Sequence, residues 1–257
     1  MKIKAAVLEQ FGEPLVLQEV ELAEPQAGEV LVRLVACGVC HTDLYTASGA
    51  DPSGYAPTVL GHEGAGVVER VGEGVASVVP GDHVVTLFSP QCRECVHCRS
   101  DRTNLCLAIR EQQNQGYLPD GTTRLGRNGE PLRHFMGTST FAEYTVMPEI
   151  ALAKLNPEAP LEQACLFACG LSTGLGAAMN TAKVEAGSTC VVFGAGMVGL
   201  GAVAGCRLRG AERIVCVDLS PERLELALGQ GATDTLVGGP SAVEEILALT
   251  AGFGADY

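Results

Sequence analysis

The sequence predicts an α/β protein with a β-rich, barrel-like first part and a second part built on a parallel sheet. The first observation is a set of short β-rich runs separated by Gly and Pro turns, which is typical of an irregular barrel. These runs are 29–36, 64–71, 82–87 and 143–147. The second is a change near Cys169, after which strand-like and helix-like segments alternate, as in parallel sheets joined by right-handed crossovers. We therefore predict domains 1–170 and 171–257.

Each element of the second part has its own signal. Apolar runs predict strands, and Ser220 before Pro221 is the N-cap pattern of a helix that ends at residue 230. The other predicted elements are strands at 189–193, 214–217 and 235–237 and helices at 197–209 and 241–250. We expect a fourth strand to begin at 255–257, where this series ends.

The composition is that of a globular protein, with 47% hydrophobic and 18% charged residues. A formal net charge of −13 would repel nucleic acids and anionic membranes, so we expect neither as a partner. No apolar run is long enough to span a membrane, and the first ten residues lack the apolar core of a secretory signal. These features predict a cytoplasmic protein.

The chain has 11 cysteines. Without a secretory signal, metal binding or catalysis explains them better than a disulfide framework. Five of them stand singly in apolar or strand-like settings and are interpreted as packing residues: Cys37, Cys165, Cys190, Cys206 and Cys216.

Four other cysteines crowd into a predicted loop at 90–108: Cys92, Cys95, Cys98 and Cys106. Four thiolates at this spacing suit a closed tetrahedral zinc site that staples a loop. Intervening residues such as Arg93 and Glu94 are polar, which does not fit a buried core. An iron–sulfur cluster is the competing interpretation. With four protein ligands, a structural zinc has no open position for chemistry.

Residues 194–199 read Gly-Ala-Gly-Met-Val-Gly and lie between a predicted strand and a predicted helix. In this context G-x-G-x-x-G predicts a dinucleotide site. Gly194 would make the tight turn, Gly196 would let the backbone approach pyrophosphate, and Gly199 would allow close helix–strand packing. Met197 and Val198 would begin the helix whose free N–H groups face the phosphates.

Asp218 ends the second predicted strand. A carboxylate there accepts hydrogen bonds from the adenosine ribose and repels a 2′-phosphate, so the sequence favours NAD over NADP. The alternative is a glycine-rich turn that binds nothing.

A catalytic zinc has fewer protein ligands and keeps one position open. Cys40 follows a predicted strand, His62 lies at a strand edge, and Cys169 lies where the pattern changes. A lone cysteine or histidine is more often a packing residue than a ligand. Spacing alone does not assemble these three residues into a site.

Several motifs together resemble the zinc-containing medium-chain alcohol dehydrogenases, over essentially the whole chain. The motifs are the four-cysteine loop, Cys-His-Thr-Asp at 40–43, Gly-His-Glu-Gly-Ala-Gly at 61–66, Met-Gly-Thr-Ser-Thr-Phe at 136–141, Glu-Tyr-Thr-Val at 143–146 and Gly-Leu-Ser-Thr-Gly at 170–174. The resemblance implies a GroES-like first domain, the first half of a doubly wound Rossmann domain, one structural zinc, one catalytic zinc and NAD.

By this resemblance, Cys40, His62 and Cys169 are the catalytic zinc ligands. The zinc would lower the pKa of the substrate alcohol, and hydride would then pass to the nicotinamide. Thr42 matches the hydroxyl that takes the alcohol proton. Many members finish the proton relay with a histidine, where this chain has Tyr45, a poor base at neutral pH.

Further residues take roles from the same resemblance. Asp43 matches a carboxylate that orients His62, and Glu63 matches a buried carboxylate behind the metal. His41 matches a residue that faces the cofactor pyrophosphate. Arg223 occupies a position that is often basic near the adenosine ribose.

The branch that acts on S-(hydroxymethyl)glutathione, in formaldehyde detoxification, is similar at 48–52, 90–92 and 109–110. Arg110 matches an arginine that holds a substrate carboxylate, although a solvated surface charge is the alternative. Asp51 matches a group that faces the glutathione end. The pocket-wall matches are Phe88, Phe135 and Met136.

Ser53 and Leu107 depart from this branch, which usually has an acidic residue and a glutamine there. The alternatives are a general primary or aryl-alcohol dehydrogenase, an inactive fragment of either enzyme, or a non-catalytic protein of this fold. The family continues through the rest of the sheet and usually dimerises there, so we expect a homo-oligomer when the chain is complete. Without that part, an unpaired sheet edge predicts partial folding and little activity.

Overall fold

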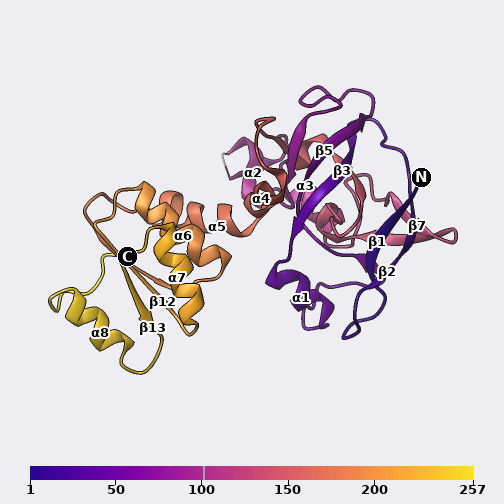
Figure 1. Cartoon of the computed structure of the whole chain (residues 1–257). Coiled ribbons are helices and arrows are strands. Elements are labelled where there is room, and N and C mark those ends of the chain that lie inside the picture. The colour runs from indigo at the N-terminus through magenta and orange to yellow at the C-terminus, as the bar shows by residue number, and fades with distance from the viewer. Residues whose placement is uncertain (101) are drawn as a thin grey trace. The chain divides into compact units, whose positions relative to one another are not determined.

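The computed structural model describes residues 1–100 and 102–257; residue 101, inside the predicted loop 90–108, lies outside the described residues. The chain forms two compact units, Met1–Cys169 and Gly170–Tyr257 (Figure 1). The predicted fold class is confirmed: the first unit contains a closed barrel, and the second contains a parallel sheet with helices.

The barrel has five strands, which pair in the order β1-β2-β7-β8-β4. They are β1 (Lys2–Leu8), β2 (Val16–Leu22), β7 (Leu125–Arg127), β8 (Glu130–His134) and β4 (Thr58–Val59). The core of the barrel is apolar: Ile3, Ala5 and Val7 of β1 are buried in it, and the alternate residues 2, 4 and 6 are exposed or half-buried. This period-2 pattern is that of a strand with one buried face.

The four strands predicted in the first part lie in a second sheet and not in the barrel. Its order is β10-β6-β5-β3-β9. Its strands are β3 (Glu29–Gly38), β5 (Glu63–Val71), β6 (His83–Thr86), β9 (Tyr144–Pro148) and β10 (Leu152–Lys154). The sequence pattern did not find the barrel strands: β4 and β7 have only two and three residues, and β1 and β2 carry charged residues on their outer face.

Helices of the first unit are short. They are α1 (His41–Ala47), α2 (Val96–Arg99), α3 (Leu107–Gln113) and α4 (Leu161–Ala164), with 3₁₀ turns at Thr103–Leu105, Phe135–Gly137, Glu149–Ala151 and Cys165–Ala168. No helix in the described parts of the chain is long and apolar enough to cross a membrane.

A buried ion pair ties the second sheet to the barrel. Glu29 starts β3, and Arg124 directly precedes β7; its Nε and Nη2 donate to the two Glu29 oxygens at 2.8 and 2.6 Å. Both side chains are less than 10% exposed. A two-point contact of this kind satisfies both charges, which burial would otherwise make costly.

The second unit has three parallel strands in the order β11-β12-β13. They are β11 (Thr189–Phe193), β12 (Arg213–Asp218) and β13 (Asp234–Val237), and the helices are α5 (Gly170–Gly176), α6 (Met197–Leu208), α7 (Pro221–Gln230) and α8 (Ala242–Leu249), with a π-helical turn at Ala177–Thr181. Every strand and helix predicted between 189 and 250 is confirmed, with bounds that differ by at most one residue. Ser220 also caps α7, since its side chain accepts from the Arg223 N–H.

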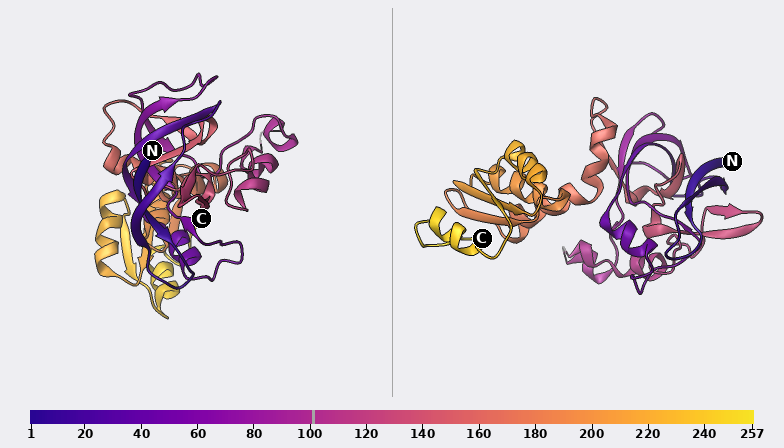
Figure 2. Two further views of the ribbon diagram at one scale, coloured as in Figure 1. Left: turned by 90° about the vertical axis from the view of Figure 1, so that its right-hand side faces the viewer. Right: turned by 60° about the horizontal axis from the view of Figure 1, so that its bottom comes forward.

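Helices cover both faces of this sheet (Figures 1 and 2). Cys190, Ile214 and Cys216 pack with residues of α6 and α7. The alternate residues Val215 and Val217 pack with Ile246 of α8. Covering on both faces is the doubly wound arrangement. Beside β11, the Val191 N–H donates to the Tyr257 carbonyl at 3.0 Å and the Asp256 N–H donates to the Thr189 carbonyl at 2.9 Å, which pairs the other edge of β11.

His134, at the end of β8, is fully buried. Neither ring nitrogen has a hydrogen-bond partner among the described residues. Burial, together with the nearby positive charge of Arg124, lowers the pKa of His134 from 6.5 to about 3. The folded protein therefore holds this ring neutral over a range in which an unfolded histidine takes up a proton.

This difference predicts a stability loss in acid. As pH falls from 6.5 toward about 3, only the unfolded chain binds the extra proton, so unfolding becomes more favourable. In His134→Leu, the free energy of unfolding from urea titrations should change less between about pH 7 and pH 5 than in wild type. His134→Gln should show the same reduced pH dependence but lower stability than His134→Leu at neutral pH, because it keeps an unpaired polar group. An unchanged pH dependence in both variants would contradict this account.

Candidate functional site

The start of α1 gathers several of the predicted site residues into one turn. Cys40 is the N-cap of this helix, with extended backbone angles. Its N–H donates to Asp43 Oδ2 at 3.0 Å, and this bond satisfies a free N–H group at the helix start. The Thr42 hydroxyl lies 3.5 Å from the Cys40 sulfur. His41 and Tyr45 are exposed.

A second segment, between β4 and β5, meets this turn through the same carboxylate. Asp43 Oδ1 accepts from the Gly61 N–H at 3.1 Å and lies 3.2 Å from His62 Nδ1. Gly61 has φ +88°, and a Cβ there would lie 2.6 Å from the Phe141 nitrogen. Glycine is therefore required for this approach. Asp43 is 2% exposed and His62 is 1% exposed, so the His62 ring is held in one orientation.

Four potential ligands converge beside this contact: Cys40, His62, Glu63 and Cys169. One ligand atom from each lies within 4.8 Å of all the others. The structure thus brings together three residues that are far apart in the chain, and it adds Glu63 to them. The Glu63 carboxylate fits against the backbone of Gly38, where a Cβ would collide with it.

The charges at this cluster favour a bound cation. Burial raises the pKa of Cys169, and the neighbouring Cys40 and Glu63 raise it further. Burial lowers the pKa of His62, but the hydrogen bonds and charges of Asp43 and Cys40 together outweigh burial and raise it overall. Two sulfurs, a carboxylate and an oriented imidazole in a partly buried site match the ligand set of zinc, which binds thiolates and neutral histidine.

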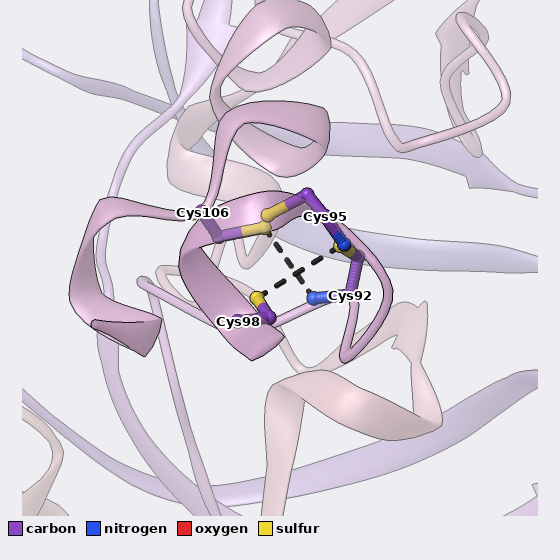
Figure 3. A group of neighbouring side chains, drawn as sticks. All are labelled: Cys92, Cys95, Cys98 and Cys106. Carbon is purple, nitrogen blue, oxygen red and sulfur yellow. Dashed lines mark hydrogen bonds between the residues drawn. The ribbon is translucent and has the colours of Figure 1, made fainter. Parts of the chain in front are cut away.

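The four cysteines of the loop form a second, separate group (Figure 3). Their sulfurs lie within 4.8 Å of one another, and the Cys92 and Cys98 sulfurs are 3.9 Å apart. Tetrahedral zinc with bonds of about 2.3 Å separates its sulfurs by about 3.8 Å, whereas a disulfide needs about 2.05 Å. An iron–sulfur cluster distributes its thiolates over several iron atoms, so this close packing favours a single ion.

Backbone N–H groups stabilise thiolates in this group. The Cys95 N–H donates to the Cys92 sulfur at 3.3 Å, and the Cys92 N–H donates to the Cys106 sulfur at 3.4 Å. Hydrogen bonds from the backbone at Cys98 and Leu107 lower the pKa of Cys95 to about 6. Arg93 and Glu94 are exposed, as predicted.

A cavity of about 180 Å³ in the first unit is lined by all five predicted substrate residues. Its lining comprises Asp51, Ser53, Tyr55, Phe88, Ser89, Arg110, Gln113, Asn114, Phe135 and Met136. Phe88 and Phe135 pack edge-on against the His62 ring, with centroids 5.2 and 6.0 Å away. The walls of the cavity therefore contact the cluster of potential metal ligands.

The cavity carries one charge of each sign. The Asp51 carboxylate accepts from the Ser53 hydroxyl at 2.7 Å, the Ser53 N–H at 2.9 Å and the Thr46 hydroxyl at 3.0 Å. The bond from the Ser53 hydroxyl is the main cause of the lowered pKa of Asp51, which keeps it ionised. Arg110 is exposed, and its Nη2 donates to the Asn104 carbonyl at 3.0 Å.

Gln113 was not identified from the sequence, although it connects two walls of this cavity. Its amide donates to the Phe88 carbonyl at 2.7 Å and to the Met136 carbonyl at 2.5 Å. The sequence carries no local signal for this glutamine, because its partners lie more than 20 residues away. Leu107, in contrast, is 56% exposed and does not line the cavity.

Residues 194–199, which the sequence predicts to bind the phosphates of a dinucleotide, follow β11 and lead into α6; we call them the phosphate turn. Gly194 has φ +94°, which favours glycine, and its N–H donates to the Val217 carbonyl at 2.7 Å. A Cβ on Gly199 would collide with the Gly194 carbonyl, so α6 starts in direct contact with the turn. Gly196 is the N-cap of α6, which begins at Met197.

A cavity of about 520 Å³ opens beside this turn. Gly194, Asp218 and Arg223 are among the residues that line it. Asp218 accepts from the Ser220 N–H at 2.8 Å and from the Ala195 N–H at 2.7 Å, and these bonds lower its pKa. Of the other predicted cofactor residues, Gly196, Met197, Val198 and Gly199 stand at the start of α6. The proximity of His41, which lies in the first unit, to this site stays a prediction.

Two family models match the chain. The alcohol dehydrogenase GroES-like domain matches residues 26–157, and the zinc-binding dehydrogenase domain matches residues 197–257.

Curated relatives and solved structures agree with these models. The chain is 57% identical to an alcohol dehydrogenase class-3 of Drosophila melanogaster, over 90% of this chain and 61% of the relative. It is 55% identical to an S-(hydroxymethyl)glutathione dehydrogenase of Escherichia coli, over 92% of this chain and 64% of the relative. The chain thus spans less than two thirds of the length of these relatives.

Among solved structures, an alcohol dehydrogenase zinc-binding domain protein from Burkholderia ambifaria matches with a TM-score of 0.93 and 41% identity, over 100% of this chain and 70% of that one. A benzyl alcohol dehydrogenase from Acinetobacter calcoaceticus matches with a TM-score of 0.89 and 35% identity, over 98% and 68% of the two chains.

The contact between Asp43 and His62 predicts a selective loss of metal affinity. Asp43→Asn removes the negative charge behind the imidazole, and affinity at this cluster should fall about 10- to 100-fold, as measured by competition with a chromophoric zinc chelator. The four-cysteine group should keep its zinc. Asp82→Asn, which alters a carboxylate paired with the exposed Lys154, is the matched control and should bind zinc as wild type does. Equal zinc affinity at the cluster in both variants would contradict the assigned role of Asp43.

Proposed function

The chain belongs to the zinc-dependent alcohol dehydrogenase family with a GroES-like domain, and on this premise we propose that it is the catalytic and cofactor-binding part of an NAD-linked dehydrogenase that oxidises S-(hydroxymethyl)glutathione. The observation that carries the proposal is the cluster of Cys40, His62 and Cys169, against which the cavity walls Phe88 and Phe135 pack through the His62 ring.

We assign Cys40, His62 and Cys169 to a catalytic zinc and the four loop cysteines to a structural zinc. When bound, the catalytic zinc makes an alcohol oxygen more acidic and NAD accepts the hydride. Thr42 would take the alcohol proton while passing its own hydroxyl proton on to the cofactor ribose, and this role is supported by its hydroxyl lying 3.5 Å from the Cys40 sulfur. Asp43 orients His62, and Glu63 provides a carboxylate next to the ligands. Phe88 and Phe135 limit the access of water.

The charges of the cavity support a glutathione adduct as the substrate. Glutathione carries an ammonium group and carboxylates at its ends, and the cavity carries Asp51 and Arg110. A forked guanidinium can hold a carboxylate at two points, and the ionised Asp51 can accept from the ammonium group. The apolar walls Phe88, Phe135 and Met136 would then contact the central part of the substrate.

A second candidate is the oxidation of free primary or aryl alcohols. The aromatic walls Phe88 and Phe135 favour it, since they suit a ring substrate as well as a thioether. Ser53 also favours free alcohols as substrates. Its neutral hydroxyl already donates to Asp51, so it supplies no second negative charge that could bind the ammonium group of glutathione.

NAD is assigned to the cavity beside the phosphate turn. The start of α6, at Gly196, Met197 and Val198, offers free N–H groups to the pyrophosphate. Asp218 accepts from the ribose, with Arg223 beside it. The partner we propose is a small-molecule substrate; the net charge of −13 would repel nucleic acids and anionic membranes. From the family resemblance, we also propose a cytoplasmic protein that forms a homo-oligomer when the chain is complete.

The deciding experiment follows NADH formation from formaldehyde, with and without glutathione, using the protein encoded by the full gene. A requirement for glutathione supports the first candidate. Turnover of simple or aryl alcohols with no effect of glutathione supports the second.

Arg110→Ala tests the carboxylate contact. Loss of a charge-assisted hydrogen bond should raise KM for the glutathione adduct about 10- to 100-fold, with little change in kcat/KM for a simple primary alcohol. Arg70→Ala removes an arginine paired with Glu24 on the surface and serves as the control, with unchanged KM for the adduct. Equal losses with both substrates would show that Arg110 acts on the fold and not on the glutathione end.

Asp218→Ser tests the choice of cofactor. Because the carboxylate repels a 2′-phosphate, its removal should narrow the preference for NAD over NADP by about tenfold or more, measured as the ratio of kcat/KM values. Asp234→Ser changes an aspartate that does not line this cavity and should keep the wild-type ratio. An unchanged ratio in Asp218→Ser would remove Asp218 from the cofactor site.

A further inference from the structure

Helices α5 and α6 of the second unit touch backbone to backbone at Gly174. A Cβ on this buried glycine would lie within 3.0 Å of three backbone atoms of α6: Val198 O, Ala202 N at 2.6 Å and Gly201 C at 2.8 Å. Side chains could turn away from such a contact, but the backbone of a helix cannot. Any side chain at position 174 would therefore have to move α6 or α5 itself.

On α6, the surface that faces α5 also carries glycines, at Gly201 and Gly205. A Cβ on Gly201 would lie 2.6 Å from the Leu171 carbonyl and 3.1 Å from the Gly174 Cα. One turn further along, a Cβ on Gly205 would lie 3.2 Å from the Leu175 carbonyl of α5 and 2.8 Å from the Ala178 side chain, in the π-helical turn that follows α5. Residues four apart lie on one face of a helix, so Gly201 and Gly205 form one strip against α5.

The first turn of α6 is held on another side by the phosphate turn. Gly199 is in direct contact with Gly194, since a Cβ there would collide with the Gly194 carbonyl. The start of α6 is thus confined between Gly194 and Gly174, with no room for a methyl group at either contact. A methyl group on Gly174 pushes against residues 198–202, so any shift of α6 that relieves the collision displaces its first turn relative to the phosphate turn.

We infer that Gly174 is a positioning residue for dinucleotide binding, although it does not line the cofactor cavity. Its lack of a side chain sets the direction of the N–H groups at the start of α6 relative to Gly194. These groups bind an anion well only when they point at it. The inference rests on the proposed dinucleotide site, and it adds a residue outside that site on which the affinity depends.

Gly176, in the same helix, provides a matched control. A Cβ there would have only the Asn180 side-chain nitrogen nearby, at 4.0 Å. Gly176→Ala therefore adds the same methyl group to the same helix without a collision, and alanine is the better helix former. Gly205→Ala is a second control, because it crowds the same helix pair but lies toward the far end of α6 from the phosphate turn.

The test combines NADH affinity with hydrogen exchange of the segment 194–202, in the zinc-loaded protein encoded by the full gene. Gly174→Ala should weaken NADH binding about tenfold or more, whereas Gly176→Ala should stay within about twofold of wild type. Exchange of 194–202 should be faster in Gly174→Ala than in Gly176→Ala. Gly205→Ala should lower Tm but retain most of the NADH affinity, and zinc content should match wild type in all three variants.

Other outcomes also decide the matter. Wild-type NADH affinity and exchange in Gly174→Ala would overturn the inference. So would failure of Gly174→Ala to fold its second unit, or equal loss of affinity in Gly205→Ala, because either result would assign the glycine to general packing. If no form binds NADH, wild type included, while exchange still differs between Gly174→Ala and Gly176→Ala, the proposed cofactor function fails and the effect of Gly174 on the phosphate turn stands.

Discussion

The geometry of the candidate site depends on the carboxylate of Asp43. One of its oxygens holds the Cys40 N–H, and the other faces the Gly61 N–H and the His62 ring. A buried charge is costly unless it is hydrogen-bonded, so these donors can separate only at a high energetic cost. One side chain thereby fixes the turn that carries Cys40 against the strand edge that carries His62, the ring against which Phe88 and Phe135 pack.

Charged and apolar groups separate into different parts of the first unit near this contact. The cluster gathers the side chains of Cys40, His62, Glu63 and Cys169 in a partly buried space, and a divalent cation would favour the deprotonated thiolates there. The adjoining cavity has apolar walls next to His62 and places its two charges at Asp51 and Arg110. The substrate proposed above has an alcohol at one end and charged groups at the other, and it would find apolar walls beside His62 and two ionic groups in this cavity.

In the second unit, the close approach of backbone segments fixes the position of the start of α6. At Gly199 the start of α6 meets the phosphate turn, and at Gly174 it meets α5. Such contacts require glycine and leave the helix little freedom to shift, because packed backbones do not deform gradually. Their position at the first turn of α6, next to a cavity lined by Asp218, connects the packing of this unit to its proposed cofactor.

The sequence by itself determined what is local: the alternation of strands and helices after Thr189, the turn from Gly194 to Gly199, and the four-cysteine loop. Spacing is informative there because the interacting residues are neighbours in the chain. It did not identify the barrel strands β1 and β2, and from the residues alone it could not join Cys40, His62 and Cys169, which only resemblance to a family grouped. Only the tertiary structure showed that these three residues meet. It also revealed the hydrogen bonds of Gln113 to the cavity walls and the contact of Gly174 with α6. Each of these contacts depends on which distant backbone segments pack against each other.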